Sequence, residues 1–255
     1  MTPRGPRMDL RGDGSGRPAL RAAFVTLVIL ASGIAASPAA AQTVRPVIVE
    51  YRQGRAEGRF ELVNDGLVPL TVVLEPRSFE VTDAGEPIYL PLDPRIRVRL
   101  STMSLRIPAG QTRVVFYEAS ADSLPAWFTI ASTFSGQRVK NGLEVRVEMP
   151  HTVYLLQKEP IARGGVGVTL ASYDPAAHQV AVAIENWTGR LGRAIETDII
   201  GPGHRERIPS FPMLPRGRRH LLLPWNAAHP PDRVVVHFAG FDIERSFAEV
   251  ATAGN

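Results

Sequence analysis

Seven consecutive residues constrain the fold of this chain more than any other stretch: Leu143-Glu144-Val145-Arg146-Val147-Glu148-Met149. The four apolar residues alternate without a break with the three charged ones, so the two kinds lie on opposite faces of an extended segment. Strict alternation with a period of two is typical of a β-strand with one buried and one solvated face. The simplest interpretation is an ordinary half-buried strand of a β-sandwich, the last strand of a first domain.

The rest of the chain also predicts β-structure. Short apolar segments are separated by turn signals such as Asn64-Asp65-Gly66, residues 83–87 and residues 108–111, and no convincing amphipathic helix interrupts them. The residues after 41 are too many for one small sandwich and suit two of about 100 residues each. We therefore predict an all-β chain with two immunoglobulin-like β-sandwich domains in tandem.

The first 41 residues are typical of a targeting segment. Five arginines precede an apolar run over 22–36. The small residues Ala39-Ala40-Ala41 then form a typical signal-peptidase cleavage site before Gln42. The run is shorter than the roughly 20 apolar residues that a membrane span needs. We expect a cleaved signal peptide, export to a bacterial periplasm and a mature protein without a membrane span.

These segments define the predicted domain organisation. After the signal peptide (1–41), an N-terminal immunoglobulin-like domain covers 42–159 and a linker covers 160–165. A C-terminal β-sandwich then covers 166–250, and 251–255 form a tail.

Composition excludes several classes of function. The signal segment takes 5 of the 29 basic and 2 of the 25 acidic residues, which leaves 24 and 23 and a net charge of +1. No basic stripe for nucleic acid remains, and without cysteine no disulfide holds the fold. The six histidines show no zinc spacing, and no hydrolase or phosphate-binding motif is present. We predict neither an enzyme nor a cofactor or metal site.

Four local motifs resemble the N-terminal domain of the periplasmic pilus chaperones of the chaperone–usher pathway, the PapD-like family. They are Phe60–Gly66 followed by Pro69–Val72, Glu75–Phe79, Ile107–Val115 and the alternating stretch Leu143–Met149. The likeness covers about 43–158 well and 166–250 loosely. It implies a chaperone that caps pilin-like subunits by donating the alternating strand to them. The client-binding residues would be Leu143, Val145, Val147 and Met149.

The resemblance also implies partners and an anchor. The partners are pilin-like subunits and an outer-membrane usher, with a possible homodimer when the chaperone is free. The family anchors the client's C-terminal carboxylate with an arginine and a lysine. Here Arg45 fits the arginine, whereas Thr152 or Val153 occupies the lysine position and His151 lies beside it. The alternatives are an anchor built from Arg45 and His151, or an exposed arginine and a hydrogen-bonded or exposed histidine.

A second class of function shares the same fold. A secreted structural or adhesion module would need the two sandwiches but no client groove, and the missing lysine favours it. A hydrolase of unrecognised type is a more distant alternative. Neither the client nor the usher is identified by the sequence.

Overall fold

The computed structural model describes residues 42–138 and 144–249. The predicted signal peptide, Leu143 of the alternating stretch and the predicted tail lie outside these residues. Within them the regular secondary structure is β-strand apart from one 3-10 helix of three residues, which confirms the predicted all-β class.

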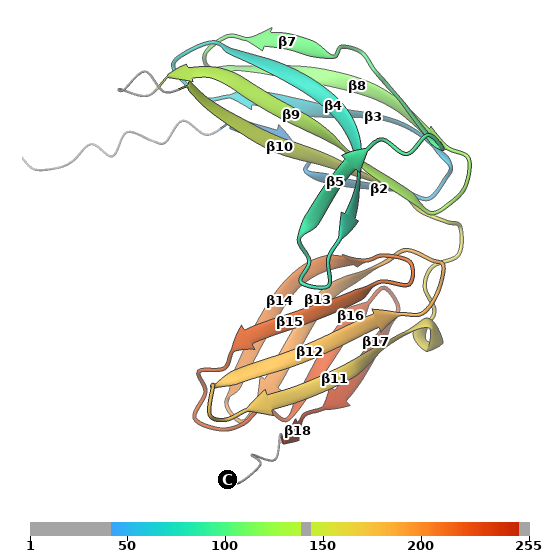
Figure 1. Cartoon of the computed structure of the whole chain (residues 1–255), viewed down its shortest axis with the longest axis vertical. Helices are drawn as coiled ribbons and strands as arrows, with labels where there is room; N and C mark the ends of the chain where they lie inside the picture. The colour runs from blue at the N-terminus through green and yellow to red at the C-terminus, as the bar shows by residue number, and fades with distance from the viewer. Residues whose placement is uncertain (1–41, 139–143, 250–255) are drawn as a thin grey trace, which may run out of the picture. The chain divides into compact units, whose positions relative to one another are not determined.

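Two facing sheets form the first sandwich (Figure 1). One sheet has the order β1-β3-β8-β6 and contains β1 (Gln42–Arg45), β3 (Arg55–Asn64), β8 (Gln111–Ala121) and β6 (Ile96–Leu100). The facing sheet has the order β2-β10-β9-β4-β5 and contains β2 (Ile48–Tyr51), β10 (Glu144–Leu155), β9 (Ala126–Arg138), β4 (Leu70–Val81) and β5 (Pro87–Pro91), with β7 (Ser104–Ile107) also paired to β4.

The second sandwich follows a short 3-10 helix, η2 (Arg163–Gly165). One sheet has the order β15-β12-β11-β18 and contains β15 (Arg218–Pro224), β12 (Gln179–Asn186), β11 (Val166–Asp174) and β18 (Ala248–Glu249). The other has the order β14-β13-β16-β17 and contains β14 (His204–Met213), β13 (Gly192–Gly201), β16 (Arg233–Phe238) and β17 (Phe241–Ser246).

The strand orders are those of immunoglobulin folds. In the letters used for immunoglobulin strands, β1 and β2 are the two halves of strand A, and β7 carries no letter. The sheets of the first sandwich then read A-B-E-D and A′-G-F-C-C′. The second sandwich reads E-B-A and C′-C-F-G, with β18 added beside A. Sheets ordered A-B-E and C-F-G characterise this fold, so the prediction of two immunoglobulin-like domains is confirmed.

Each sandwich has its own apolar core. Phe60, Phe128 and Phe134 are buried between the sheets of the first sandwich, and Trp225 and Ile184 between those of the second. Full burial of one such side chain stabilises the fold by about 1.5–3 kcal/mol. Strand β10 ends at Leu155 and β11 begins at Val166. The predicted linker lies between these strands, while the exact domain boundaries stay a prediction.

One buried asparagine closes the same turn in both sandwiches. At the end of β3, the Asn64 side-chain amide donates to the carbonyl oxygens of Val68, Ile107 and Pro108 at 2.9, 3.1 and 3.1 Å. Its side-chain oxygen accepts from the Gly66 amide at 3.1 Å. The asparagine therefore joins the turn after β3 to the turn between β7 and β8.

Asn186 repeats this geometry at the end of β12. Its side-chain amide donates to the carbonyl oxygens of Arg190, Met213 and Leu214 at 2.7, 3.3 and 2.8 Å. Its side-chain oxygen accepts from the Thr188 amide at 3.0 Å. Both asparagines are completely buried. The turn after β3 and the turn after β12 therefore depend on the same kind of polar contact.

Candidate functional site

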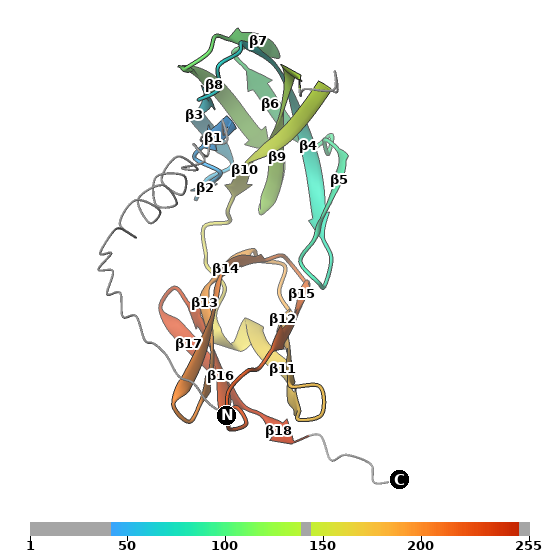
Figure 2. The same ribbon diagram turned by 90° about the vertical axis from the view of Figure 1, so that its left-hand side faces the viewer.

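Strand β10 is paired along its whole length on one edge and only partly on the other. It pairs antiparallel with β9 from Glu144 to Leu155, with a shift of register between Val145 and Val147 where the extra residue lies in β9. Strand β2 runs parallel beside Thr152–Leu155 only. Within the described parts of the chain, Glu144–His151 therefore has no strand on its second edge (Figure 2). We call this segment the open edge.

The apolar side chains of the open edge continue the interior face of the sandwich. His151 and Val153 on this face are fully buried, and Met149 is partly buried against the same core. Val145 and Val147 are partly exposed. The alternation that the sequence predicted thus extends from the closed core toward the open edge.

The opposite face of the open edge is polar. Arg146 and Glu148 are exposed, and Arg77 on β4 lies 3.2 Å from the Glu148 carboxylate. An exposed ion pair of this kind contributes about 0–1 kcal/mol to stability. The charged face is therefore solvated, as the alternation predicts.

The backbone of the open edge presents free polar groups. The Thr152 amide donates to the Val47 carbonyl at 2.7 Å, on the side of β10 that β2 covers. Because backbone groups point to alternate sides along a strand, the N–H and C=O groups of Arg146 and Glu148 point to that same side, where β2 is absent. A row of unpaired backbone groups can accept another strand.

His151 is buried and its ring has protein partners. Its Nδ1 lies 2.6 Å from the Pro46 carbonyl oxygen and its Nε2 lies 3.3 Å from the Tyr117 hydroxyl. The ring stacks on Phe60 with centroids 4.6 Å apart. Burial lowers the pKa of His151, against an opposing effect of the bond to Pro46. The structure thus places a buried, hydrogen-bonded histidine here, and burial favours its neutral form.

Arg45 has a different environment from His151. Its side chain is 61% exposed, and its nearest carboxylate is Glu61 at 3.4 Å. Each of the two predicted anchor residues has its own partners, and the structure does not join them into one site. Of these two residues, Arg45 is exposed to a ligand and His151 is buried.

The surroundings of His151 were not predicted from the sequence. The Tyr117 hydroxyl lies 3.0 Å from the Tyr51 hydroxyl, and Gly58 makes room for this pair. A Cβ atom at Gly58 would lie 2.3 Å from the Tyr117 ring and 2.5 Å from the Tyr51 hydroxyl. Glycine inside a strand is the sequence signal that could have indicated such a close approach.

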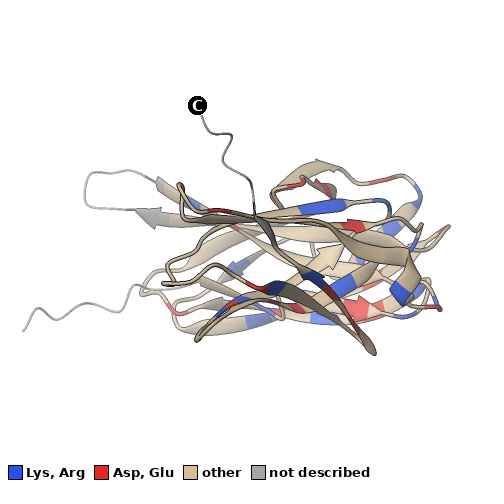
Figure 3. Cartoon of the chain, turned by 90° about the horizontal axis from the view of Figure 1, so that it is seen from below, with Lys and Arg blue, Asp and Glu red and all other residues tan. Residues whose placement is uncertain are grey.

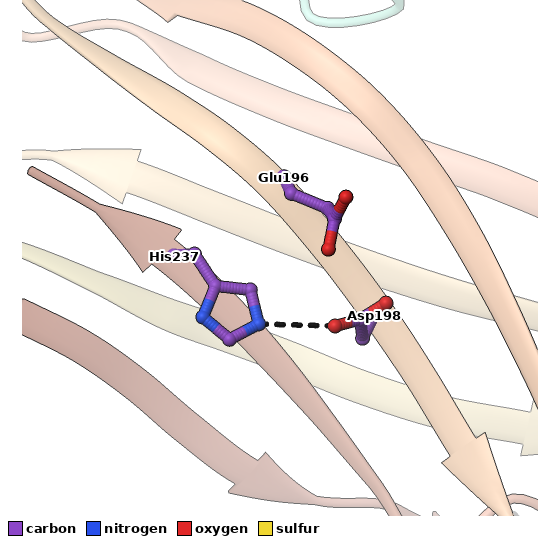
Figure 4. A group of neighbouring side chains, drawn as sticks. All are labelled: Glu196, Asp198 and His237. Atoms are coloured by element: carbon purple, nitrogen blue, oxygen red, sulfur yellow. Dashed lines mark hydrogen bonds and ion pairs between the residues drawn. The ribbon is translucent and has the colours of Figure 1, made fainter.

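A second cluster of titratable side chains lies on the β14-β13-β16-β17 sheet (Figure 4). His237 on β16 has its Nε2 3.0 Å from Asp198 and its Nδ1 2.8 Å from Asp242. Both ring nitrogens face carboxylates, so only the imidazolium form donates to both. Burial lowers the pKa of His237, but the bonds to Asp242 and Asp198 outweigh it, and the net pKa is raised.

Two arginines complete this network. Arg205 and Arg207 on β14 both contact the fully buried carboxylate of Asp198. The hydrogen bond from Arg205 is the main cause that lowers the pKa of Asp198 to about 2, against the effect of burial. Glu196, Asp198 and His237 lie close enough to contact one ion, but the positive partners of Asp198 favour an ion-pair network.

This network predicts that the folded protein loses stability at both low and high pH. Asp198 stabilises the fold above its ordinary pKa, and that contribution is lost as the pH falls toward about 2. His237 stabilises it fully below about 6.5, its ordinary pKa, and the contribution is lost as the pH rises through the raised value. Urea unfolding between about pH 5 and pH 9 should show stability falling on the alkaline side.

The variant His237→Asn should lose this alkaline slope, because the titrating ring is gone. His229→Asn changes an exposed histidine and should retain the slope. An unchanged slope in His237→Asn would contradict the role of the network.

Charge is distributed evenly in the described part of the chain. Figure 3 shows Lys and Arg interspersed with Asp and Glu along the strands. None of the described residues forms a helix that is both long and apolar enough for a membrane span.

Comparisons with known proteins give similarity of structure only. No protein family model and no curated protein matches the chain. A chain of the complex between the SafA pilin and the SafB chaperone of Salmonella enterica aligns with 81% of this chain and 96% of its own length, at 11% identity and a TM-score of 0.49. The YadV chaperone aligns over 80% and 97%, at 15% identity and a TM-score of 0.48.

A third similar structure is a complex of the CsuC chaperone with the CsuE tip adhesion subunit from Acinetobacter baumannii. It aligns over 83% of this chain and 100% of its own length, at 10% identity and a TM-score of 0.46. Each of the three contains a protein named as a chaperone. At these identities and TM-scores, the assignment of the fold rests on the strand order described above.

Proposed function

We propose that this protein is a periplasmic chaperone that caps pilin-like subunits by donor-strand complementation through β10. The observation that carries the proposal is the open edge, where unpaired backbone groups and a partly exposed apolar row occur together. A subunit that lacks one strand exposes an apolar groove with unpaired edges. The open edge supplies both requirements of that groove, backbone pairing and alternate apolar side chains.

The energetics favour a partner with a matching groove. Burying a valine, leucine or methionine contributes about 1.5–3 kcal/mol each, before the cost of association. Val145, Val147 and Met149 supply three such side chains, and Leu143, which lies outside the described residues, would supply a fourth. A shift of one residue would turn Arg146 and Glu148 into the groove, so the alternation also fixes the register.

The partners and location follow from this role. We propose export by the predicted signal peptide, release of the client to an outer-membrane usher, and self-association through the open edge when no client is bound. Pilus assembly by this route would contribute to the organisation of the cell surface. The role requires no catalytic residue, cofactor or metal.

The test is co-purification of a tagged pilin-like subunit encoded beside this protein's gene. We expect the mature chain to be recovered with the subunit from periplasmic extract in a one-to-one complex. Subunit that is equally soluble with and without this chain would count against the proposal. It would favour the alternative, a secreted structural or adhesion module.

Arg45 is the proposed anchor for the client's C-terminal carboxylate. A charge-assisted hydrogen bond of this kind contributes about 1.5–3 kcal/mol. We therefore expect Arg45→Ala to raise the Kd for the client about tenfold or more, measured by titration calorimetry.

Arg55→Ala is a matched control, because Arg55 is also an exposed arginine of the same sheet, with carboxylates 3.9 Å away. It should leave the Kd unchanged. Equal effects of the two variants would show that Arg45 contributes only general charge and that the anchor lies elsewhere.

A further inference from the structure

The first sandwich has a second strand that exposes apolar side chains at an edge. All five residues of β5 are exposed, among them Ile88, Tyr89 and Leu90. Among the residues that the structure describes, β5 pairs only with β4. On side-chain character alone, β5 would attract a partner strand as well as the open edge does.

The backbone of β5 argues against strand addition there. The Thr82 amide donates to the Glu86 carbonyl at 2.9 Å, so Glu86 faces β4. By the two-residue period, Ile88 and Leu90 also face β4, while Pro87, Tyr89 and Pro91 point to the free side. Two of these three residues are prolines without an N–H group, and prolines in this position protect an edge from pairing.

The open edge of β10 has a different distribution of donors. The outward positions are Glu144, Arg146 and Glu148, followed by Pro150 and then Thr152. Pro150 has no N–H group, and the Thr152 amide already donates to Val47. Within the described residues, the amides of Glu144, Arg146 and Glu148 are therefore the donors that a partner strand can use before Pro150.

We infer that Pro150 sets the register of the partner strand by ending the backbone ladder on the open edge. This inference rests on the proposed function and adds a residue that determines which part of β10 the client pairs with. The partner is an extended segment with alternate apolar side chains, which accepts from the amides of Arg146 and Glu148 and donates to their carbonyls. Sliding it two residues toward β2 keeps the apolar face but places a partner carbonyl opposite Pro150, where no donor exists.

Residue-resolved amide hydrogen exchange tests the inference. The probe is the capped peptide acetyl-Thr-Val-Thr-Val-Thr-Val-Thr-amide, added to the mature protein at low concentration. In the free protein, the amides of Arg146 and Glu148 should exchange quickly, and those of Val147 and Thr152 slowly. The peptide should slow exchange at Arg146 and Glu148 about tenfold or more and leave Thr152 unchanged.

The variant Pro150→Ala restores one outward amide. We expect that new amide to become protected when the peptide binds, so the ladder extends by one position. Pro91→Ala restores an outward amide on β5 instead and should leave the protection of Arg146 and Glu148 unchanged. Thermal melting of both variants checks that the fold is intact.

Several outcomes would overturn the inference. Arg146 and Glu148 amides that are already protected in the free protein would show that the edge is closed. Protection at Tyr89 in place of these two would move the site to β5. Protection that rises with protein concentration and that the peptide does not reproduce at low protein concentration would make a second copy of the chain the occupant and would contradict the inferred partner.

The failure of this inference is distinguishable from that of the proposed function. If the peptide protects the open edge as expected but no pilin-like subunit is recovered with the chain, the proposed function is wrong and the register stop remains. If a subunit is recovered but Pro150→Ala adds no protected amide, the register stop is wrong and the chaperone role remains.

Discussion

The double substitution Val145→Asp with Val147→Asp should abolish client binding while the chain stays folded. Both valines lie on the open edge and are partly exposed, and neither belongs to the core of the first sandwich. In a complex, two carboxylates would enter the client's apolar groove, where burying an unpaired charge is prohibitive. We therefore expect complete loss of co-purified subunit and a melting temperature close to that of the unchanged protein.

Two variants of the same strand serve as controls for this prediction. Val153→Asp changes a valine on the same face of β10 that is completely buried in the core, so it should unfold the first sandwich. Arg146→Asp changes the exposed, opposite face and should retain the client. A double variant that melts as early as Val153→Asp would return the alternating stretch to the role of an ordinary core strand.

Met149 is left unchanged in the double variant for a structural reason. It packs partly against the closed core, so a charge there would disturb both the fold and the client site. The alternation in the sequence assigns Met149 and Val145 to one face but not to different depths. Depth depends on where β2 stops covering β10, which is a tertiary feature.

The interior strands were the part of the fold that the sequence predicted well. Apolar residues recur over 56–63 and 179–185, where the structure has β3 and β12, and over 233–238, where it has β16. These strands are paired on both edges, and their apolar residues have to match the core on every second position. A strong constraint on packing leaves a strong pattern in the sequence.

Strands β5, β7 and β14 are among those that the sequence did not predict. Strands β5 and β14 contain prolines, and β7 is only four residues long. Strands β5 and β14 lie at sheet edges, where a proline can occupy the unpaired side without losing a ladder bond. A rule that takes proline as a break in β-structure therefore fails at edges.

The candidate site was predicted in part. The sequence selected β10 because alternation is a local property. It could not separate Arg45, which is exposed, from His151, which is buried between β10 and β8, because burial depends on contacts between distant strands. The open edge itself also required the structure, since it depends on the length of β2.

Asn64 and Asn186 occupy equivalent turns of the two sandwiches, and replacing either should lower the stability of its sandwich strongly. Asn64 and Asn186 are both completely buried, and each donates to three carbonyl oxygens while accepting from an amide two residues later in the chain. Leaving a buried carbonyl without its donor costs about 1–3 kcal/mol. Each asparagine therefore stabilises two turns at once, at a position where the backbone cannot pair with itself.

The substitution Asn64→Asp should destabilise the first sandwich strongly. Aspartate is almost isosteric with asparagine, but it replaces the donating amide with an oxygen that repels the carbonyls of Val68, Ile107 and Pro108. An uncompensated buried charge costs about 3–5 kcal/mol, so we expect the melting temperature to fall by more than about 10 °C. Calorimetry gives the melting temperature, and amide hydrogen exchange shows which sandwich opens.

The controls follow from the repeated geometry. Asn186→Asp should have a comparable effect confined to the second sandwich, because the same contacts are lost there. Asp65→Asn changes the charge of the exposed neighbour and should alter stability by no more than about 0.5 kcal/mol. If Asn64→Asp melted like Asp65→Asn, the turn after β3 would be held by its backbone alone, and the buried amide would not be needed to close either sandwich.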